Sequence, residues 1–303
     1  MKKKLAVAGL LAAFVAASVT TVMSAESTTY SFTTINVTTD NFTQLLGVNN
    51  SGEIVGYHGS GAAGHPFVGE TLIPPSSFTI ENYPGSAQTQ VTAINTNGAT
   101  AGFYIDNSGV NHGFTKISGK FVTVDFPDPT SVLTQILSIN GQNEVAGYWQ
   151  NGSGTQFPFT EKAGVFTLLD TKLPSNTSAQ ATGVNNEGDI CGFYVDSSSV
   201  NHGFLILHTG KVTLLNFAGA TLTQAFGLNN LQQVVGTYND AKGNMHGFLY
   251  DELSNEYEAV NDPKGADTTI VNGINDEGEI VGFYVDTTGA TDGFLGRIAR
   301  CTQ

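Results

Sequence analysis

The chain of 303 residues is long enough for one large domain or two ordinary ones, and its 40% hydrophobic content is ample for a buried core. Only 13% of the residues are charged and 36 are glycine, a composition typical of strands joined by tight turns and unlike a disordered or long-helical chain. The formal net charge of −14 repels phosphate backbones, which excludes nucleic acid as an expected partner and favours cations, neutral sugars or proteins.

The amino terminus has the order of a secretory signal peptide. Three lysines precede an apolar run that ends near Val19, and small residues stand around Ala25. We expect residues 1–25 to be removed on export, leaving a mature domain of residues 26–303. A retained anchor is the alternative, and the periplasm, the cell surface and the medium are all possible destinations. No later apolar run has the length of a membrane span.

Six repeats of about 45 residues follow, beginning near residues 47, 93, 138, 183, 227 and 273. The copy at 183–204 reads GVNNEGDICGFYVDSSSVNHGF. Every copy has an anchor asparagine, and a glycine stands seven residues after it. The asparagines are Asn49, Asn95, Asn140, Asn185, Asn229 and Asn275, and the glycines are Gly56, Gly102, Gly147, Gly192, Gly236 and Gly282. The anchor falls in a turn in which asparagine adopts a left-handed conformation or makes an Asx-turn.

Each repeat divides into four short strand-like runs, the pattern of a propeller blade. The last repeat lacks its fourth run, whereas residues 30–37 (YSFTTINV) resemble fourth runs such as GKFVTVDF. The sequence therefore predicts an all-β, six-bladed β-propeller with four antiparallel strands per blade. The amino-terminal strand would complete the sixth blade and close the ring, which leaves no pair of unprotected sheet edges.

The pattern GVNN-x-G-x-IVG followed by HGF resembles the extracellular repeats of the HAF family, which carry His-Ala-Phe where this chain mostly has His-Gly-Phe. The resemblance covers residues 29 to 297 or so, and it implies export and a repeat fold. It supplies no catalytic residues.

Acids and imidazoles recur on either side of the loop between the second and third runs. In three repeats both are present, as Asp106 with His112, Asp196 with His202, and Asp240 with His246. We interpret these pairs as structural loop clamps, because one reaction needs one site and has no reason to recur around a ring. A symmetric binding ring or repeated cation sites are the alternatives.

The sixth repeat has Asp286 and Asp292 at these positions, and the first has Ser60 and His65. Two neighbouring carboxylates need solvation, a proton or a cation such as Ca²⁺, so these two aspartates are a speculative metal site. We expect no other cofactor.

Two further positions repeat with side chains suited to binding. Two residues after each glycine stands a ring, at His58, Tyr104, Trp149, Tyr194, Tyr238 and Tyr284. Five residues before the anchor asparagine stands an amide in five repeats, at Gln44, Gln90, Gln135, Gln180 and Gln224. The rings are candidates for stacking on sugars or for core packing. The amides, if the first run lines the central channel, are candidates for ligand contacts or for internal hydrogen bonds.

Cys191 aligns with valine and alanine in the other repeats, which predicts a buried core residue, and Cys301 lies past the last run. No HExxH, GxSxG, P-loop or paired CxxC motif occurs. The sequence thus favours an exported, non-enzymatic repeat protein that binds a glycan or protein, of unknown oligomeric state. The alternative is a propeller-type glycan hydrolase or lyase, whose site at the channel mouth should break the symmetry of the repeats.

Overall fold

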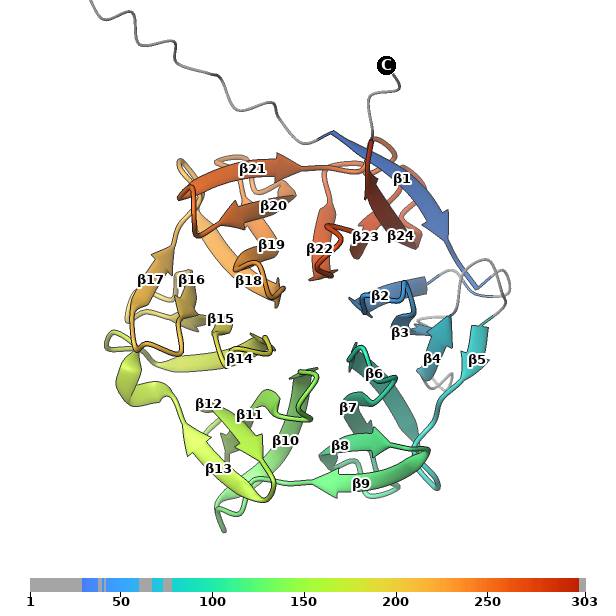
Figure 1. The fold of residues 1–303 in the computed structure, drawn as a ribbon, viewed down its shortest axis with the longest axis vertical. Helices are drawn as coiled ribbons and strands as arrows, with labels where there is room; N and C mark the ends of the chain where they lie inside the picture. The colour runs from blue at the N-terminus through green and yellow to red at the C-terminus, as the bar shows by residue number, and fades with distance from the viewer. Residues whose placement is uncertain (1–28, 38–39, 41, 60–66, 73–77, 300–303) are drawn as a thin grey trace, which may run out of the picture.

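The computed structural model describes residues 29–37, 40, 42–59, 67–72 and 78–299 (Figure 1). The expected signal peptide, Ser60, His65 and Cys301 lie outside these residues. Nearly all of the described chain is β-strand or turn, with one short 3₁₀ helix, η1 (Asp170–Lys172). Within the described ranges, no helix is long and apolar enough to cross a membrane.

The strands follow the repeats in chain order. The strand before the first repeat is β1 (Tyr30–Ile35). The first repeat holds β2 (Phe42–Val48), β3 (Ile54–Gly59), β4 (Val68–Leu72) and β5 (Phe78–Ile80). The second holds β6 (Gln88–Ile94), β7 (Thr100–Ile105), β8 (Asn111–Ile117) and β9 (Lys120–Val124). The third holds β10 (Ser131–Ile139), β11 (Val145–Asn151), β12 (Gln156–Lys162) and β13 (Val165–Leu168).

The fourth repeat holds β14 (Ser178–Val184), β15 (Ile190–Val195), β16 (Asn201–Ile206) and β17 (Val212–Leu215). The fifth holds β18 (Leu222–Leu228), β19 (Gln233–Asn239), β20 (Met245–Asp251) and β21 (Glu256–Val260). The sixth holds β22 (Thr269–Ile274), β23 (Ile280–Val285) and β24 (Thr291–Ile298).

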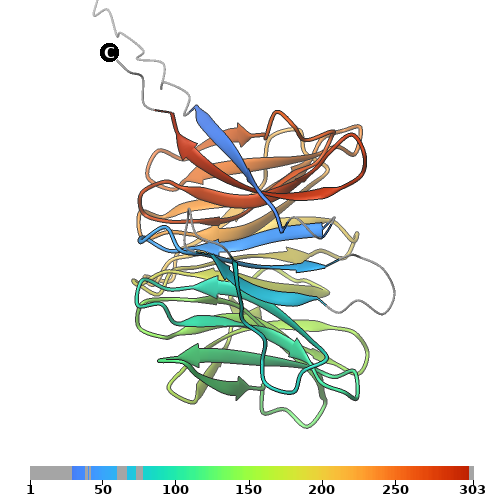
Figure 2. The same ribbon diagram turned by 90° about the vertical axis from the view of Figure 1, so that its right-hand side faces the viewer.

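The sheets surround a central opening, with the first strand of each repeat innermost and the fourth at the rim, so the chain is an all-β propeller (Figure 1). In the edge-on view, the strands of successive repeats lie one above another (Figure 2).

The division into sheets differs from the six separate blades that the sequence predicts. The second, third, fourth and fifth repeats each form a four-stranded sheet, but the strands of the first and sixth repeats belong to one eight-stranded sheet. The two halves of that sheet join where β2 pairs with β24 in parallel, through Phe42 and Thr291, the one such pair among the described residues. We call this join the seam.

The amino-terminal strand lies where the repeat pattern places it. β1 pairs antiparallel with β24 over its whole length, from Tyr30 opposite Ile298 to Ile35 opposite Gly293. The Phe32 ring meets the Phe294 ring edge-on, with centroids 5.3 Å apart. The last repeat thus receives its outer strand from the other end of the described chain.

The recurring glycine of the second strand has a steric cause. A Cβ atom built on Gly192 would lie 2.1 Å from the Gln180 carbonyl oxygen, and the other five glycines face the corresponding carbonyl at 1.9 to 2.1 Å. Opposite this glycine, on the third strand, five repeats hold a fully buried phenylalanine, at Phe114, Phe159, Phe204, Phe248 and Phe294. The glycine therefore lets the first and second strands approach and makes room for the ring.

Candidate functional site

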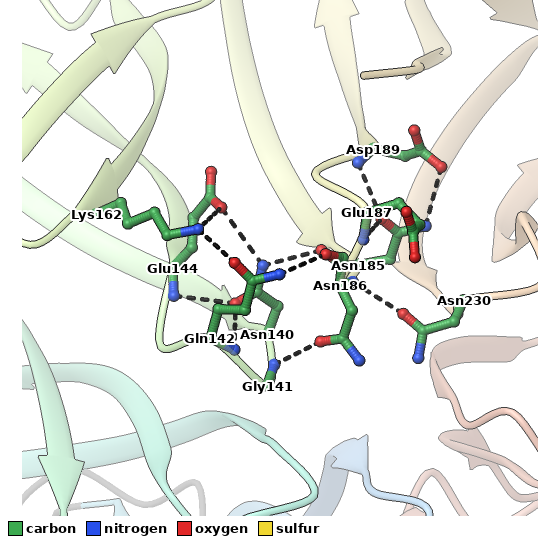
Figure 3. A network of polar contacts seen from close by, with 10 residues as sticks. All are labelled: Asn140, Gly141, Gln142, Glu144, Lys162, Asn185, Asn186, Glu187, Asp189 and Asn230. Atoms are coloured by element: carbon green, nitrogen blue, oxygen red, sulfur yellow. Dashed lines mark hydrogen bonds and ion pairs between the residues drawn. The ribbon is translucent and has the colours of Figure 1, made fainter. Parts of the chain in front are cut away.

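Six anchor asparagines form a closed ring of hydrogen bonds at one mouth of the central channel. The Nδ2 of each donates to the backbone carbonyl of the next asparagine around the ring, at 2.8 to 3.2 Å, and Asn275 returns to Asn49. The Oδ1 of each accepts from two backbone N–H groups of its own turn, as Asn185 does from Glu187 and Asp189 (Figure 3). The expected Asx-turn is present. The hydrogen bond from each asparagine to the next repeat is an additional contact that the sequence pattern does not indicate.

A second, incomplete set of contacts lies beside this ring. Asn186 accepts from Gly141 N–H at 2.7 Å, and Asn230 accepts from Asn186 N–H at 2.8 Å (Figure 3). Asp276 accepts from the Asn230 N–H and from its side chain, at 2.8 and 2.7 Å. The amide and carboxylate groups of this mouth thus hydrogen-bond to one another. These contacts hold successive repeats together.

The channel wall further along is built by β-bulges. Each first strand has a register shift next to its glycine or small residue, and the extra residue faces the channel. These six residues are Leu46, Thr92, Leu137, Thr182, Phe226 and Asn272, and with Gln180 they line a cavity of about 180 Å³. Because the bulge adds a residue to each first strand, the sequence pattern does not show that these six residues face the channel.

The six bulge residues alternate around the channel. The polar ones donate to the neighbouring repeat: Thr92 to the Ile136 carbonyl at 2.9 Å, Thr182 to Ala225 at 2.9 Å, and Asn272 to Leu45 at 2.9 Å. The remaining three, Leu46, Leu137 and Phe226, are apolar and half-buried. The cavity wall therefore contains an apolar triad, Leu46, Leu137 and Phe226. The three polar residues between them already donate hydrogen bonds within the protein.

The predicted glutamines contact neighbouring side chains, and of the five only Gln180 lines this cavity. Gln44 accepts from Tyr57 Oη at 2.6 Å and Gln135 from Tyr148 Oη at 2.7 Å. Gln180 donates to Gln156 at 2.9 Å, and Gln224 donates to Asn201 at 3.2 Å. Gln90, on β6, is the exception: its side chain makes no hydrogen bond among the described residues, and its backbone pairs with Phe103.

Four of the six predicted ring positions lie in ring stacks away from the channel, and His58 lies between Asp40 and Glu70. Tyr104 stacks on Tyr83 with centroids 3.8 Å apart, Trp149 on Phe126 at 5.0 Å and Tyr238 on Phe217 at 3.7 Å. Their other faces are covered by His112, Phe157 and His246. Tyr194 stacks on His202, and Tyr284 bonds Thr34. In the stacks closed on both sides, no open face is left for a sugar.

The structure brings each predicted acid and imidazole together. Nε2 of His202 lies 3.1 Å from Asp196 Oδ2, Nε2 of His246 lies 3.4 Å from Asp240, and Nε2 of His112 lies 3.6 Å from Asp106. The same aspartates cap their own turns. The backbone N–H of Val200, then His202, holds the pKa of Asp196 below its usual value.

Asp240 shows the same balance. Burial raises its pKa, but hydrogen bonds from the N–H groups of Asn244 and Lys242 and from His246 outweigh burial and bring the pKa to about 2. These pairs thus hold the loop between the second and third strands in place.

The two aspartates of the sixth repeat have separate partners. Asp286 accepts from the hydroxyl and N–H of Thr288, which lower its pKa, and Asp292 accepts from Asn36 Nδ2 at 2.5 Å. Within the described residues, no group of three or more His, Cys, Asp or Glu side chains is placed to hold a metal ion. Cys191 is fully buried, which raises its thiol pKa to about 12.

The first repeat departs from the alignment that the sequence suggests. His65-Pro66-Phe67 looks like the His-Gly-Phe of other repeats, but in the structure Gly56 pairs with Glu70, as Gly192 pairs with Phe204. Val68-Gly69-Glu70 therefore stands where the others have His-Gly-Phe. Glu70 is 1% exposed, and neither carboxylate oxygen has a hydrogen-bond partner within the described part of the chain. A carboxylate thus occupies the position of the core phenylalanine.

Comparisons with known proteins agree with this architecture. No family model and no curated protein matches the sequence. The structure resembles AofleA from Arthrobotrys oligospora at 11% identity, with 89% of this chain and 86% of that chain covered and a TM-score of 0.54. It resembles a mutant Aleuria aurantia lectin in complex with alpha-methyl-L-fucoside at 12% identity, with 83% and 90% covered and a TM-score of 0.50.

TolB from Acinetobacter baumannii is 10% identical, with 76% of this chain and 59% of that chain covered and a TM-score of 0.50. At such identities the likeness shows the fold alone. The chain is a β-propeller.

Proposed function

We propose that the protein is an exported, non-enzymatic propeller of six blades, with HAF-like repeats, that binds an extracellular glycan or protein ligand in its central channel. Export is supported by the amino-terminal sequence. Six blades are supported by the six-membered asparagine ring and by the seam, where, among the described residues, one residue pair joins the two halves of the eight-stranded sheet. On this reading, β1 and β22–β24 form one blade and β2–β5 another.

The observation that carries the binding role is the apolar triad of Leu46, Leu137 and Phe226. The repeated polar groups of the ring have partners within the protein, whereas these side chains present half-buried apolar surface to a cavity of about 180 Å³. Ligand sites are concave, mostly apolar and bounded by few polar groups. Phe226 is the aromatic member of this wall, and an aromatic ring packs well against the C–H face of a sugar. We therefore place a neutral sugar first among ligands.

The lectin with alpha-methyl-L-fucoside shares the fold at 12% identity, which is compatible with this choice but does not specify a sugar. The enzymatic alternative is a glycan hydrolase or lyase at the channel mouth, and the hydrolase requires paired acids. Among the described residues that line the channel cavities, Asp276 is the one carboxylate, and it accepts from Asn50 and Asn230. This arrangement favours binding over hydrolysis.

The test is a glycan-array screen on residues 26–303, followed by titration of each hit with wild-type protein and Phe226→Ala. Removal of a packed aromatic anchor is expected to weaken affinity by tenfold or more, about 1.4 kcal/mol. Leu253→Ala is the matched control, because Leu253 is 81% exposed in the turn before β21 and should bind as wild type.

Unchanged affinity in Phe226→Ala would place the ligand elsewhere. Turnover of a hit that a substitution in one repeat abolishes would favour the enzymatic alternative.

A further inference from the structure

The largest departure from the repeat pattern is a cluster of Asp40, His58 and Glu70 in the first repeat. His58 takes the position of Tyr104, Trp149 and Tyr238, and Glu70 takes that of the buried phenylalanine. Three repeats thus have a stack of rings over a phenylalanine here, and the first has an imidazole between two carboxylates.

The three side chains form a chain of contacts. Nδ1 of His58 meets Asp40 Oδ2, and Nε2 of His58 lies 3.7 Å from Glu70 Oε2. The imidazole thus lies between the two acids, with Nδ1 toward Asp40 and Nε2 toward Glu70. Burial, and next the charge of Asp40, raise the pKa of Glu70 to about 8. A protonated, neutral Glu70 therefore limits the charge in the core.

The other described groups around β4 supply no positive charge that would neutralise the Glu70 carboxylate. β5 and β6 carry no titratable residue. On β3, Tyr57 donates to Gln44. Glu81, just after β5, is engaged with Thr71, Thr100 and Lys116, the last at 3.0 Å. His58 is thus the one basic group of the described residues placed beside Glu70.

We propose that Asp40, His58 and Glu70 act as a proton-controlled lock on the first repeat: Glu70 holds a proton in neutral solution, and its loss in mildly alkaline solution loosens β4 from β3 and β6 next to the seam. A second negative charge would then lie in a site built for an aromatic ring. The lock makes the seam side the pH-sensitive part of the ring.

The direction in which stability changes with pH follows from proton linkage. The pKa of Glu70 is raised in the folded state from 4.5 to about 8, so the folded protein binds the proton more tightly than the unfolded chain. The stabilising effect is complete below pH 4.5 and is lost as the pH rises to about 8. Within this window the unfolding equilibrium constant should rise by up to about tenfold per pH unit.

The test compares urea unfolding of wild type, Glu70→Gln and Glu70→Phe across this window, with Glu256→Gln, an exposed carboxylate, as the control. We expect the wild type and the control to share the slope and both Glu70 variants to lose it. Glu70→Phe covers the case in which the glutamine variant does not fold, since it restores the residue of the other repeats. Hydrogen exchange of β4 amides relative to β20 amides should rise with pH in the wild type and the control, but not in the two Glu70 variants.

Parallel profiles for wild type and the Glu70 variants would overturn the proposal. Stabilisation of wild type, but not of Glu70→Gln, by added Zn²⁺ would also overturn it, because a metal ion would then fill the place given to the proton.

Discussion

The alanine variant of Asn185 is expected to unfold with a free energy about 3–5 kcal/mol below that of the wild type. Asn185 is 3% exposed, and its side chain takes part in four hydrogen bonds. Its Oδ1 accepts from the N–H groups of Glu187 and Asp189, and its Nδ2 donates to Asp189 Oδ2 and to the Asn229 carbonyl. Alanine leaves these groups without partners, and each buried one costs about 1–3 kcal/mol.

Two variants sharpen this experiment. Asn185→Asp keeps the acceptor but places an oxygen against Asp189 Oδ2 and the Asn229 carbonyl, so it should be no more stable than the alanine variant. Asn107→Ala, in the exposed turn between β7 and β8, should change the free energy of unfolding by less than about 0.5 kcal/mol. A loss below about 1 kcal/mol for Asn185→Ala would show that the ring contributes little to stability.

Gly192→Ala is expected to cost about 3 kcal/mol or more. Its Cβ would lie 2.1 Å from the Gln180 carbonyl oxygen and 2.6 Å from the Phe204 ring, so β14 and β15 must separate to admit the methyl group. Denaturant unfolding, or the yield of folded protein if the variant is too unstable, measures the effect.

Gly152→Ala is the matched control, since the nearest atom to its Cβ is 4.0 Å away and the change should stay within about 0.5 kcal/mol. Equal stabilities for the two glycine variants would contradict the steric explanation.

The propeller was predictable because each period of about 45 residues divides into four strand-like runs separated by turn residues. The partner of the amino-terminal strand followed from the missing last run. The acid and imidazole pairs were predictable because both residues flank one hairpin. Relations between residues of one repeat or one hairpin can therefore be predicted from the sequence.

The rest depends on register and on neighbours. In the first repeat, His-Pro-Phe imitates the motif of the other repeats, and only the pairing of Gly56 with Glu70 reveals the buried carboxylate. The bulge turns Phe226 to the channel, although its place in the sequence pattern is ordinary. The bond from each asparagine to the next repeat joins residues 44 to 46 positions apart, or 226 at the closure, and no local pattern records it.

The pairing of β1 with β24 sets how the ring responds to tension. Tyr30 and Ile298 stand opposite each other at the same end of an antiparallel pair, and the chain leaves both strands on that side (Figure 1). A pull on the two residues in opposite directions loads the hydrogen bonds one pair at a time, so the strands peel apart at low force instead of shearing together. Tethered through these ends, the propeller would open first at β1.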